Sequence, residues 1–534
     1  MVDTDTQAQV RADKIHDRRW AILAVLVLSL LIVVLDNSVL NVALKTLADP
    51  KKGLGASQSD LEWAINSYTL VFAGMLLSWG VMGDRVGRRR ILTLGFVIFG
   101  IASLASAYSH SPGQLIAARA LMGLGGAAVM PATLSIISNV FDPKERAKAI
   151  GIWAGAVGMG IAIGPIVGGA LLGHFWWGSV FLINVPIVVL GLVLIRILVP
   201  ESRNPNPGRH DPVGVVLEVI GLTLVIYSLI KVGDLGSVRP PQVWATFLVG
   251  AIVIAIFVRF EQRSDHPTLD IALFKDPRFS AAVGSIGLVF FALMGTTFFM
   301  VFYLQIVRGY TPLQAGVRIL PLAIGQIIAS PRSPKLVRRF GAKAVCTGGL
   351  VMMTLTFVGY VALGQHTSIW VLEALFFVQG FGMGNIMPPA TESIMASVPR
   401  EKAGAGSAIN NVSRQVGAAL GIAVLGSVLA ASYRKGIDPT LSKLPIPGSV
   451  RVQMEKSVEA THAVVEKVGA GLQQVLPASD KAFIHAMHVT SLFSALFALL
   501  GTFVAYRFLP GRGPAEAVAA VPHAAVPQPE LVSE

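Results

Sequence analysis

Long apolar windows recur along this chain, and short polar segments separate them. A transmembrane helix needs roughly 20 consecutive, mostly apolar residues, so each window predicts one membrane span. The predicted spans are 20–43, 62–81, 90–108, 112–134, 148–172, 178–198, 213–230, 242–259, 279–304, 312–331, 344–363, 369–395, 405–431 and 488–508. The pattern therefore predicts an all-α membrane protein with fourteen transmembrane helices.

Short motifs repeat at nearly equal spacing between the two ends of this array. The recurring pairs are Pro-Lys-Glu-Arg-Ala at 143–147 with Pro-Arg-Glu-Lys-Ala at 399–403, Gly123-Leu-Gly with Gly380-Phe-Gly, Pro131-Ala-Thr with Pro389-Ala-Thr, and Arg85-Val-Gly with Arg339-Phe-Gly. Internal repeats of this kind are typical of transporters built from two related halves. We therefore expect one six-helix bundle over 20–198, a second over 279–508, and two additional helices within 199–278.

Three segments lie outside the predicted spans. Residues 1–19 form a polar N-terminal tail, and the apolar run that follows is too long for a signal-peptide core, which predicts an uncleaved first span. Residues 432–487 form a long loop whose 450–475 stretch has helix-like apolar spacing, and this favours a surface hairpin over a binding module. Residues 509–534, rich in Pro, Ala and Val, predict a disordered tail.

Composition and charge agree with a membrane protein. Of the 534 residues, 53% are hydrophobic and 14% are charged, whereas soluble domains carry about 25% charged residues. The mean hydropathy is +0.66. The net charge of +13 is spread over loops that share one side of the membrane, such as 82–90 and 140–148. The positive-inside bias therefore predicts that both termini are cytoplasmic. It also explains the charge without a nucleic-acid partner.

The most specific motif lies in the loop after the second predicted span, where glycines permit a tight turn between helices. Its candidate gate residues are Gly83, Asp84, Arg85, Gly87 and Arg88. An ordinary positive-inside loop explains the arginines but neither Asp84 nor the glycine spacing.

The positive end of a helix dipole favours an anion. We therefore expect Asp84 to dock on the helix that begins near Gly404, which would tie the two halves together. We also expect Arg88 to pair with Asp142 or Glu145 of the next inside loop.

Glycines recur in the fifth span, at Gly160, Gly164, Gly168 and Gly169, and Pro165 lies among them. Small residues four apart allow helix backbones to approach closely, and a proline removes a backbone donor and bends a helix. A pliable, tightly packed helix suits an interface at which two halves rock. Generic tight packing is the alternative.

Ionisable residues inside spans are candidates for function, because burying a charge in a membrane is unfavourable. Asp36 lies in the first span, and burial favours its protonation, as a proton carrier requires. A structural acid bonded to neighbouring hydroxyls is the alternative. Arg119 in the fourth span needs a partner, and an acid such as Asp36 is a candidate. Arg414 is a second intramembrane cation, and Glu392 is either a coupling acid or an interfacial residue.

Aromatic and polar residues in the second and ninth spans form a candidate substrate cavity. Its predicted members are Trp63, Asn66, Tyr68, Phe298, Phe299, Phe302 and Tyr303. A flexible aromatic and Met-rich wall accepts many ligand shapes, and one acid favours lipophilic cations. The alternative is that these side chains face lipid.

Several of these motifs resemble those of one family. The stretch from Gly80 to Arg90 resembles the hallmark loop of the major facilitator superfamily. The stretch from Gly160 to Gly169 resembles the antiporter motif of its drug exporters. Segments 35–44, 387–395 and 406–417 resemble the fourteen-span drug/proton antiporters that export quaternary ammonium compounds. The resemblance implies proton coupling through Asp36, Arg119, Glu392 and Arg414, although Asn411 stands where many relatives carry an acid.

The resemblance implies a secondary transporter of the bacterial cell membrane that exports lipophilic, cationic compounds by alternating access and works as a monomer. We expect no catalytic site, no metal and no cofactor other than the coupling proton. The sequence contains no Gly-rich loop with Gly-Lys-Ser/Thr, so direct ATP drive is not indicated. Cys346 is the single cysteine, which excludes an intrachain disulfide.

Two alternatives remain open at this stage. The first is a dedicated exporter of one metabolite, antibiotic or lipid, or an importer. The second is a membrane-embedded enzyme or sensor, which would need a catalytic constellation or a sizeable soluble domain.

Overall fold

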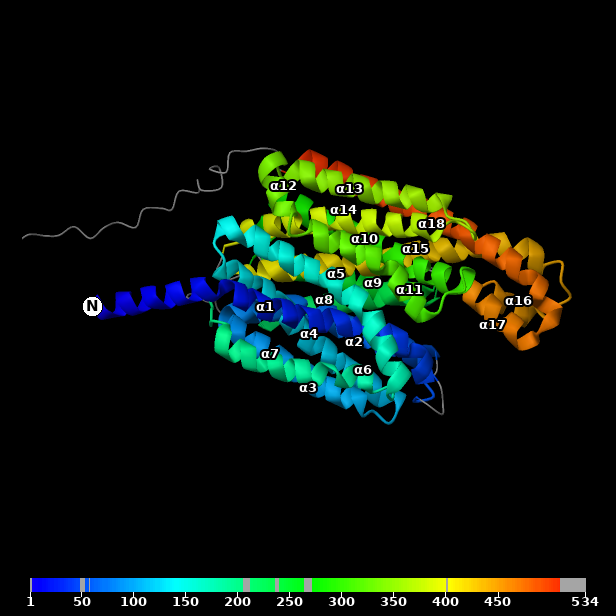
Figure 1. Cartoon of the computed structure of the whole chain (residues 1–534), viewed down its shortest axis with the longest axis horizontal. Coiled ribbons are helices and arrows are strands. Elements are labelled where there is room, and N and C mark those ends of the chain that lie inside the picture. Colours follow the sequence, from blue (N-terminus) through cyan, green and yellow to red (C-terminus); the bar gives the residue numbers. More distant parts are fainter. Residues whose placement is uncertain are drawn as a thin grey trace, which may run out of the picture.

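The computed structural model describes residues 2–48, 53–56, 58–204, 212–235, 240–263, 271–399 and 402–509. Within these residues the regular elements are helices, and the long ones run side by side along one common direction (Figure 1). Twelve described helices are long and apolar enough to cross a membrane, and a pair bent by 52° at 313–340 makes a thirteenth when counted as one span. The predicted all-α membrane fold is confirmed.

The helices follow the predicted order. The first bundle contains α1 (Val2–Ala48), α2 (Gln58–Val86), α3 (Arg88–Ala107), α4 (Pro112–Val140), α5 (Pro143–His174), α6 (Ser179–Leu182) and α7 (Asn184–Leu198). The additional segment contains α8 (Pro212–Leu235), α9 (Pro241–Glu261) and η1 (Ile271–Lys275). The second bundle contains α10 (Pro277–Phe302), the π-helical turn η2 (Tyr303–Val307), α11 (Pro312–Ala329), α12 (Ser333–Phe340), α13 (Ala342–Gly359), η3 (Tyr360–Ala362), α14 (Ile369–Ala396), α15 (Ala403–Leu441) and α18 (Leu476–Phe508). Thirteen of the fourteen predicted spans each overlap one long helix, including the 32-residue α5, and the span at 178–198 is divided between α6 and α7.

Local sequence explains where several helices begin. Ser111 accepts a hydrogen bond from the Gln114 amide with Pro112 at the first helical position of α4, and Thr311 forms a capping box with Gln314 at α11. These are standard N-terminal signals, because they satisfy amides that the helix leaves unpaired.

The repeated Arg-x-Gly motif has the same backbone role in both halves. Gly87 has a φ of +127° immediately before α3, and Gly341 has a φ of +86° immediately before α13. Glycine adopts positive φ without the steric penalty that other residues pay. The two copies are thus structural equivalents, which agrees with the predicted repeat.

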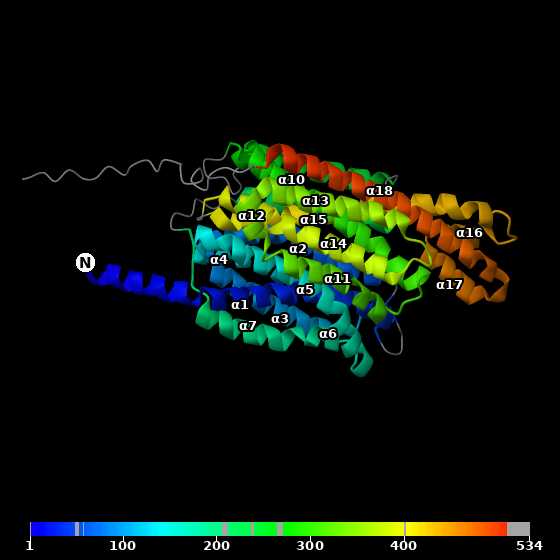
Figure 2. The ribbon, with the colours of Figure 1, turned by 45° about the horizontal axis from the view of Figure 1, so that its top comes forward.

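The two bundles lie next to each other, with α3 and α7 at one side of the molecule and α13 and α18 at the other (Figures 1 and 2). Contacts between the bundles come from α2 against α15, α5 against α11, and α4 against α15. The additional helix α8 packs on both α2 and α15, and α9 packs on α8. The two extra helices therefore cover one side of the junction between the halves.

The predicted 432–487 loop is more helical than expected. Helix α15 continues to Leu441 and α18 begins at Leu476, and between them lie α16 (Gly448–Met454), α17 (Val458–Val468) and η5 (Ala470–Val475). Buried hydrogen bonds of 2.8 Å join the Tyr433 hydroxyl to Thr461 and Ser479, so polar pairing extends the helices beyond the apolar windows. These elements project at the end opposite the N-terminus (Figure 1). The predicted tail at 510–534 lies outside the described residues.

Candidate functional site

A buried ion pair lies within the first bundle, between α1 and α4. Arg119 donates to Asp36 Oδ2, and the two side chains are 0% and 1% exposed. The guanidinium also donates to the Ala64 carbonyl at 3.2 Å and lies 4.5 Å from the centre of the Tyr68 ring. The structure thus places Arg119 against Asp36, the acid that the sequence suggested as its partner.

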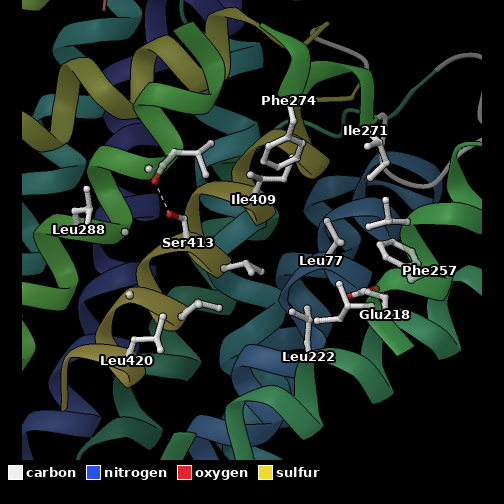
Figure 3. A pocket seen from close by; sticks show the side chains of 18 of the residues that line it. Leu77, Glu218, Leu222, Phe257, Ile271, Phe274, Leu288, Ile409, Ser413 and Leu420 are labelled. Carbon is white, nitrogen blue, oxygen red and sulfur yellow. Dashed lines mark hydrogen bonds between the residues drawn. The ribbon is translucent and has the colours of Figure 1, made fainter. Parts of the chain in front are cut away.

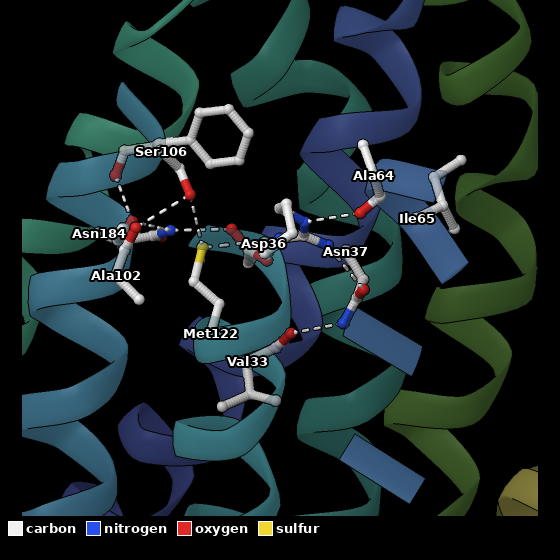
Figure 4. A network of polar contacts seen from close by, with 12 residues as sticks. Val33, Asp36, Asn37, Ala64, Ile65, Ala102, Ser106, Met122 and Asn184 are labelled. Carbon is white, nitrogen blue, oxygen red and sulfur yellow. Dashed lines mark hydrogen bonds and ion pairs between the residues drawn. The ribbon is translucent and has the colours of Figure 1, made fainter. Parts of the chain in front are cut away.

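A second donor holds the other oxygen of this carboxylate. Asn184 of α7 donates to Asp36 Oδ1 at 3.0 Å and to Ser103 Oγ at 3.1 Å (Figure 4). Sequence reasoning missed Asn184, although an asparagine inside an apolar span is a signal of the same kind as a buried acid. Asp36 therefore accepts hydrogen bonds from two helices, and a proton that neutralises it removes the charge that pairs with Arg119.

A second cluster joins the two halves at one end of the molecule, here called the Asp84 end. Asp84 accepts hydrogen bonds from the Gly404 amide at 2.8 and 3.0 Å and from the Ala405 amide at 3.3 Å. These amides belong to the first turn of α15, where the helix dipole and unpaired donors favour an anion. The expected docking of Asp84 on this helix is confirmed.

The partner expected for Arg88 is different. Arg88 donates to Asp84 Oδ1 through Nε at 3.0 Å and through Nη2 at 2.8 Å, whereas Glu145 accepts from Arg19 Nε at 2.7 Å. Arg88 and Asp84 lie four positions apart, which places their side chains on one face. Arg88 therefore pairs with Asp84 of its own motif, whereas the sequence suggested Asp142 or Glu145 of the next loop.

A further ion pair crosses between the halves near the same end. Arg146 at the start of α5 donates to Glu392 of α14 at 3.0 Å, and the Glu392 side chain is 22% exposed. Sequence reasoning did not predict Arg146 in this role. Whether Glu392 is a coupling acid or an interfacial residue stays a prediction.

Arg414 of α15 is buried among aromatic rings. Its guanidinium lies 4.7 Å from the centre of Phe290 and 5.9 Å from Trp153 of α5. Among the residues that the structure describes, no carboxylate lies within ion-pair distance of it. The contact with Trp153 places Arg414 beside the other half, and its role in coupling stays a prediction.

The glycines of α5 face both halves. A methyl group at Gly160 would lie 2.8 Å from Val34 of α1, and one at Gly164 would overlap Ser38 of α1. On another face, a methyl at Gly158 would lie 2.6 Å from Gln326 of α11. Pro165 lies in the same helix by its backbone, and its side chain is outside the described part of the chain. Helix α5 is therefore packed tightly between α1 and the second bundle.

This packing makes Gly164→Ala destabilising. The added methyl overlaps Ser38, and overpacking typically costs about 1–3 kcal/mol. Gly173→Ala on the same helix is the matched control, because a methyl there meets no heavy atom within 4 Å. We expect thermal unfolding of the purified protein at a lower temperature for Gly164→Ala and at an unchanged or higher one for Gly173→Ala. Equal behaviour of the two variants contradicts this packing.

The seven residues predicted to form a substrate cavity have different neighbours in the structure. Trp63 stacks on Tyr227 of α8 with ring centres 6.1 Å apart, and Tyr68 belongs to the Arg119 network. Tyr303 donates to the Gly364 carbonyl at 2.8 Å, and Phe299 is buried in α10. The Phe298 side chain is outside the described residues, and Asn66 and Phe302 are half-buried. A cavity of about 630 Å³ elsewhere in the molecule is lined by none of the seven.

Comparison with known proteins agrees with this arrangement. Residues 26–422 match the model of the Major Facilitator Superfamily, and the chain belongs to this superfamily of transporters. It is therefore a multi-pass membrane protein that moves small molecules and is not an enzyme.

Two relatives are similar over almost their whole length. The chain is 37% identical to the multidrug efflux pump LfrA of Mycolicibacterium smegmatis, over 90% of this chain and 94% of that protein. It is 36% identical to the methyl viologen resistance protein SmvA of Salmonella typhimurium, over 90% of this chain and 97% of that one. The human organic anion transporter MFSD10 shares the fold, with a TM-score of 0.59, 16% identity, and coverage of 91% of this chain and 98% of that one.

Proposed function

We propose that this chain exports lipophilic cations from the cell in exchange for protons, as a monomer of the fourteen-span quaternary-ammonium exporter type. The observation that carries the proposal is the buried Asp36–Arg119 pair, because a carboxylate isolated from water in a span is suited to take up and release a proton. The two relatives named for multidrug efflux and methyl viologen resistance support drug export over import.

In this proposal Asp36 is ionised while Arg119 and Asn184 hold it. A proton arriving on Asp36 neutralises the carboxylate and breaks the ion pair, which leaves Arg119 held by the Ala64 carbonyl, the Asn37 side-chain oxygen and the Tyr68 ring. Breaking a buried pair is strongly unfavourable. Protonation therefore favours a different packing of α1 against α4, and the tight α1–α5 contact carries that change to the junction between the halves.

The Asp84 end acts as the cytoplasmic gate in the same proposal. Arg19, Arg88, Arg89 and Arg146 lie at this end, and positive charge in short loops favours the cytoplasmic side. Asp84 on α15 and Arg146 with Glu392 hold the halves together there, so both contacts have to break before a substrate enters from the cytoplasm. Both termini are cytoplasmic in this orientation.

Efflux from preloaded cells tests the proposal. Cells that express the chain are loaded with rhodamine 6G, and its release is followed with and without a proton uncoupler. We expect release faster than in cells that lack the chain, and loss of that difference when the uncoupler is present. Uncoupler-resistant release contradicts proton coupling. Failure to release several such dyes favours a dedicated exporter of one compound.

A further inference from the structure

Glu218 is a buried acid that the transport proposal does not use. It lies in the first turns of α8, one of the two additional helices, and is 1% exposed. Its Oε2 accepts a hydrogen bond from Ser78 of α2 at 2.6 Å. Its Oε1 has no hydrogen-bond partner among the described residues. A carboxylate oxygen that is buried without a donor is unfavourable, so it calls for an explanation.

This side chain lines the cavity of about 630 Å³, here called the α8 cavity. The wall contains residues of α2, α8, α9, α10 and α15, among them Leu77, Leu222, Phe257, Leu288 and Leu420 (Figure 3). Glu218 is the charged residue of this lining. The Ser413 hydroxyl in the wall already donates to the Val283 carbonyl at 2.6 Å. An apolar wall with one free acceptor defines what fits inside.

The α8 cavity lies at the lipid-facing side of the molecule. Phe274 at its edge is 41% exposed, and Ile252 and Ile256 on the outer face of α9 are 58% and 50% exposed. Apolar residues exposed on a membrane span face the hydrocarbon. This side of the molecule is therefore the one from which a compound in the lipid would enter the cavity.

We infer that the α8 cavity is a binding site for a lipophilic cation that enters from the lipid, with Glu218 as its counter-charge. The apolar wall takes the hydrocarbon body of the ligand, and the Glu218 carboxylate pairs with the positive charge; a ligand that carries an N–H donates it to Oε1. Opposite charge at the one ionisable side chain of the lining favours a cation over a neutral lipid. Glu261 of α9, also buried, is a second acid that interacts electrostatically with Glu218.

The inference rests on the proposed function only for its role in export, where the site would collect substrate beside the junction of the halves. Binding itself needs no proton gradient, so it is measured separately. This site also gives the two additional helices a role, since α8 supplies the acid and α9 part of the wall.

Protection of a thiol tests the site directly. Gly284→Cys places a thiol in the cavity wall, where the structure leaves open space, and Cys346→Ala removes the native thiol. The purified full chain in lipid nanodiscs is alkylated with N-ethylmaleimide, with and without rhodamine 6G. At ten times its Kd the cation leaves about a tenth of the sites free, so we expect alkylation about tenfold slower. Gly348→Cys on exposed α13 is the control thiol and is expected to show no protection.

The substitution Glu218→Gln separates charge from shape. Glutamine keeps an oxygen for Ser78 and removes the charge, so we expect at least about tenfold more rhodamine 6G to be needed for equal protection. Protection by neutral N-phenyl-1-naphthylamine is expected to stay unchanged in this variant.

No protection by rhodamine 6G overturns the inference. Equal protection with and without Glu218 also overturns it, because it identifies an apolar niche that lipid fills. If cells that express the chain show no dye efflux while rhodamine 6G still protects the thiol in nanodiscs, the proposed export is overturned and the binding site is retained.

Discussion

Cells that express Asp36→Asn are expected to lose uncoupler-sensitive dye efflux completely. Asparagine keeps the size of the side chain and its hydrogen-bond acceptor, but it cannot take up a proton. It also leaves the buried Arg119 guanidinium without a counter-charge, which typically costs about 3–5 kcal/mol. Transport by Asp36→Asn at native expression contradicts the assignment of Asp36 as the proton carrier.

A double variant separates coupling from stability. Adding Arg119→Gln to Asp36→Asn removes the uncompensated charge, so the thermal unfolding temperature is expected to recover towards the native value while efflux stays absent. Glu373→Gln is the control for loss of an ion pair, because Glu373 pairs with Arg318 at 2.7 Å and Arg318 is 36% exposed. We expect this control to retain efflux. Recovery of efflux in the double variant would show that the pair serves only stability.

Asp84→Asn is expected to open the Asp84 end. The change removes the charge that three amide hydrogen bonds and Arg88 share, and one hydrogen bond to a charged group contributes about 1.5–3 kcal/mol. A loss of about 2–3 kcal/mol shifts the equilibrium between closed and open states by roughly 30- to 150-fold. We expect net efflux to fall, because an open cytoplasmic gate cannot support alternating access.

Distances between two spin labels, measured by double electron–electron resonance, report this opening. Spin labels attached through Arg90→Cys and Lys402→Cys, in the Cys346→Ala background, report on exposed sites of α3 and of the start of α15. Asp84→Asn is expected to add a longer-distance population. Asp438→Asn is the control, since this half-exposed acid pairs with Arg451 at the opposite end. An unchanged distance distribution in Asp84→Asn contradicts the gate.

The helices and one of the contacts between halves were predictable from sequence for physical reasons. Apolar windows of membrane length leave the backbone no alternative to a helix. Asp84 follows a span that topology places beside the start of α15, and a helix start attracts an anion wherever it is. The four-residue spacing of Asp84 and Arg88 is a local signal for their pair, because residues four apart are neighbours on a helix surface.

Contacts that depend on the relative rotation of helices were not predictable. Asp36, Arg119 and Asn184 lie on three helices, and no local pattern says which of their faces meet. The same holds for Arg146 with Glu392. Glu218 is an acid in an apolar window that sequence reasoning missed, and the α8 cavity beside it results from packing among several helices. The predicted aromatic residues of α2 and α10 have the right composition for a cavity and different neighbours in the structure.

We propose that Asp36 carries the one proton that is exchanged for each monovalent cation, and flux in proteoliposomes tests this most directly. Such an exchange moves no net charge, so membrane voltage, worth about 2.3 kcal/mol per charge per 100 mV, does not drive it. Purified protein in liposomes is given either a pH gradient or a potassium diffusion potential, and ethidium and proton fluxes are recorded together. We predict coupled fluxes of equal size with the pH gradient, none with the potential alone, and none in Asp36→Asn. Flux driven by the potential alone, or proton-coupled flux in Asp36→Asn, contradicts the claim.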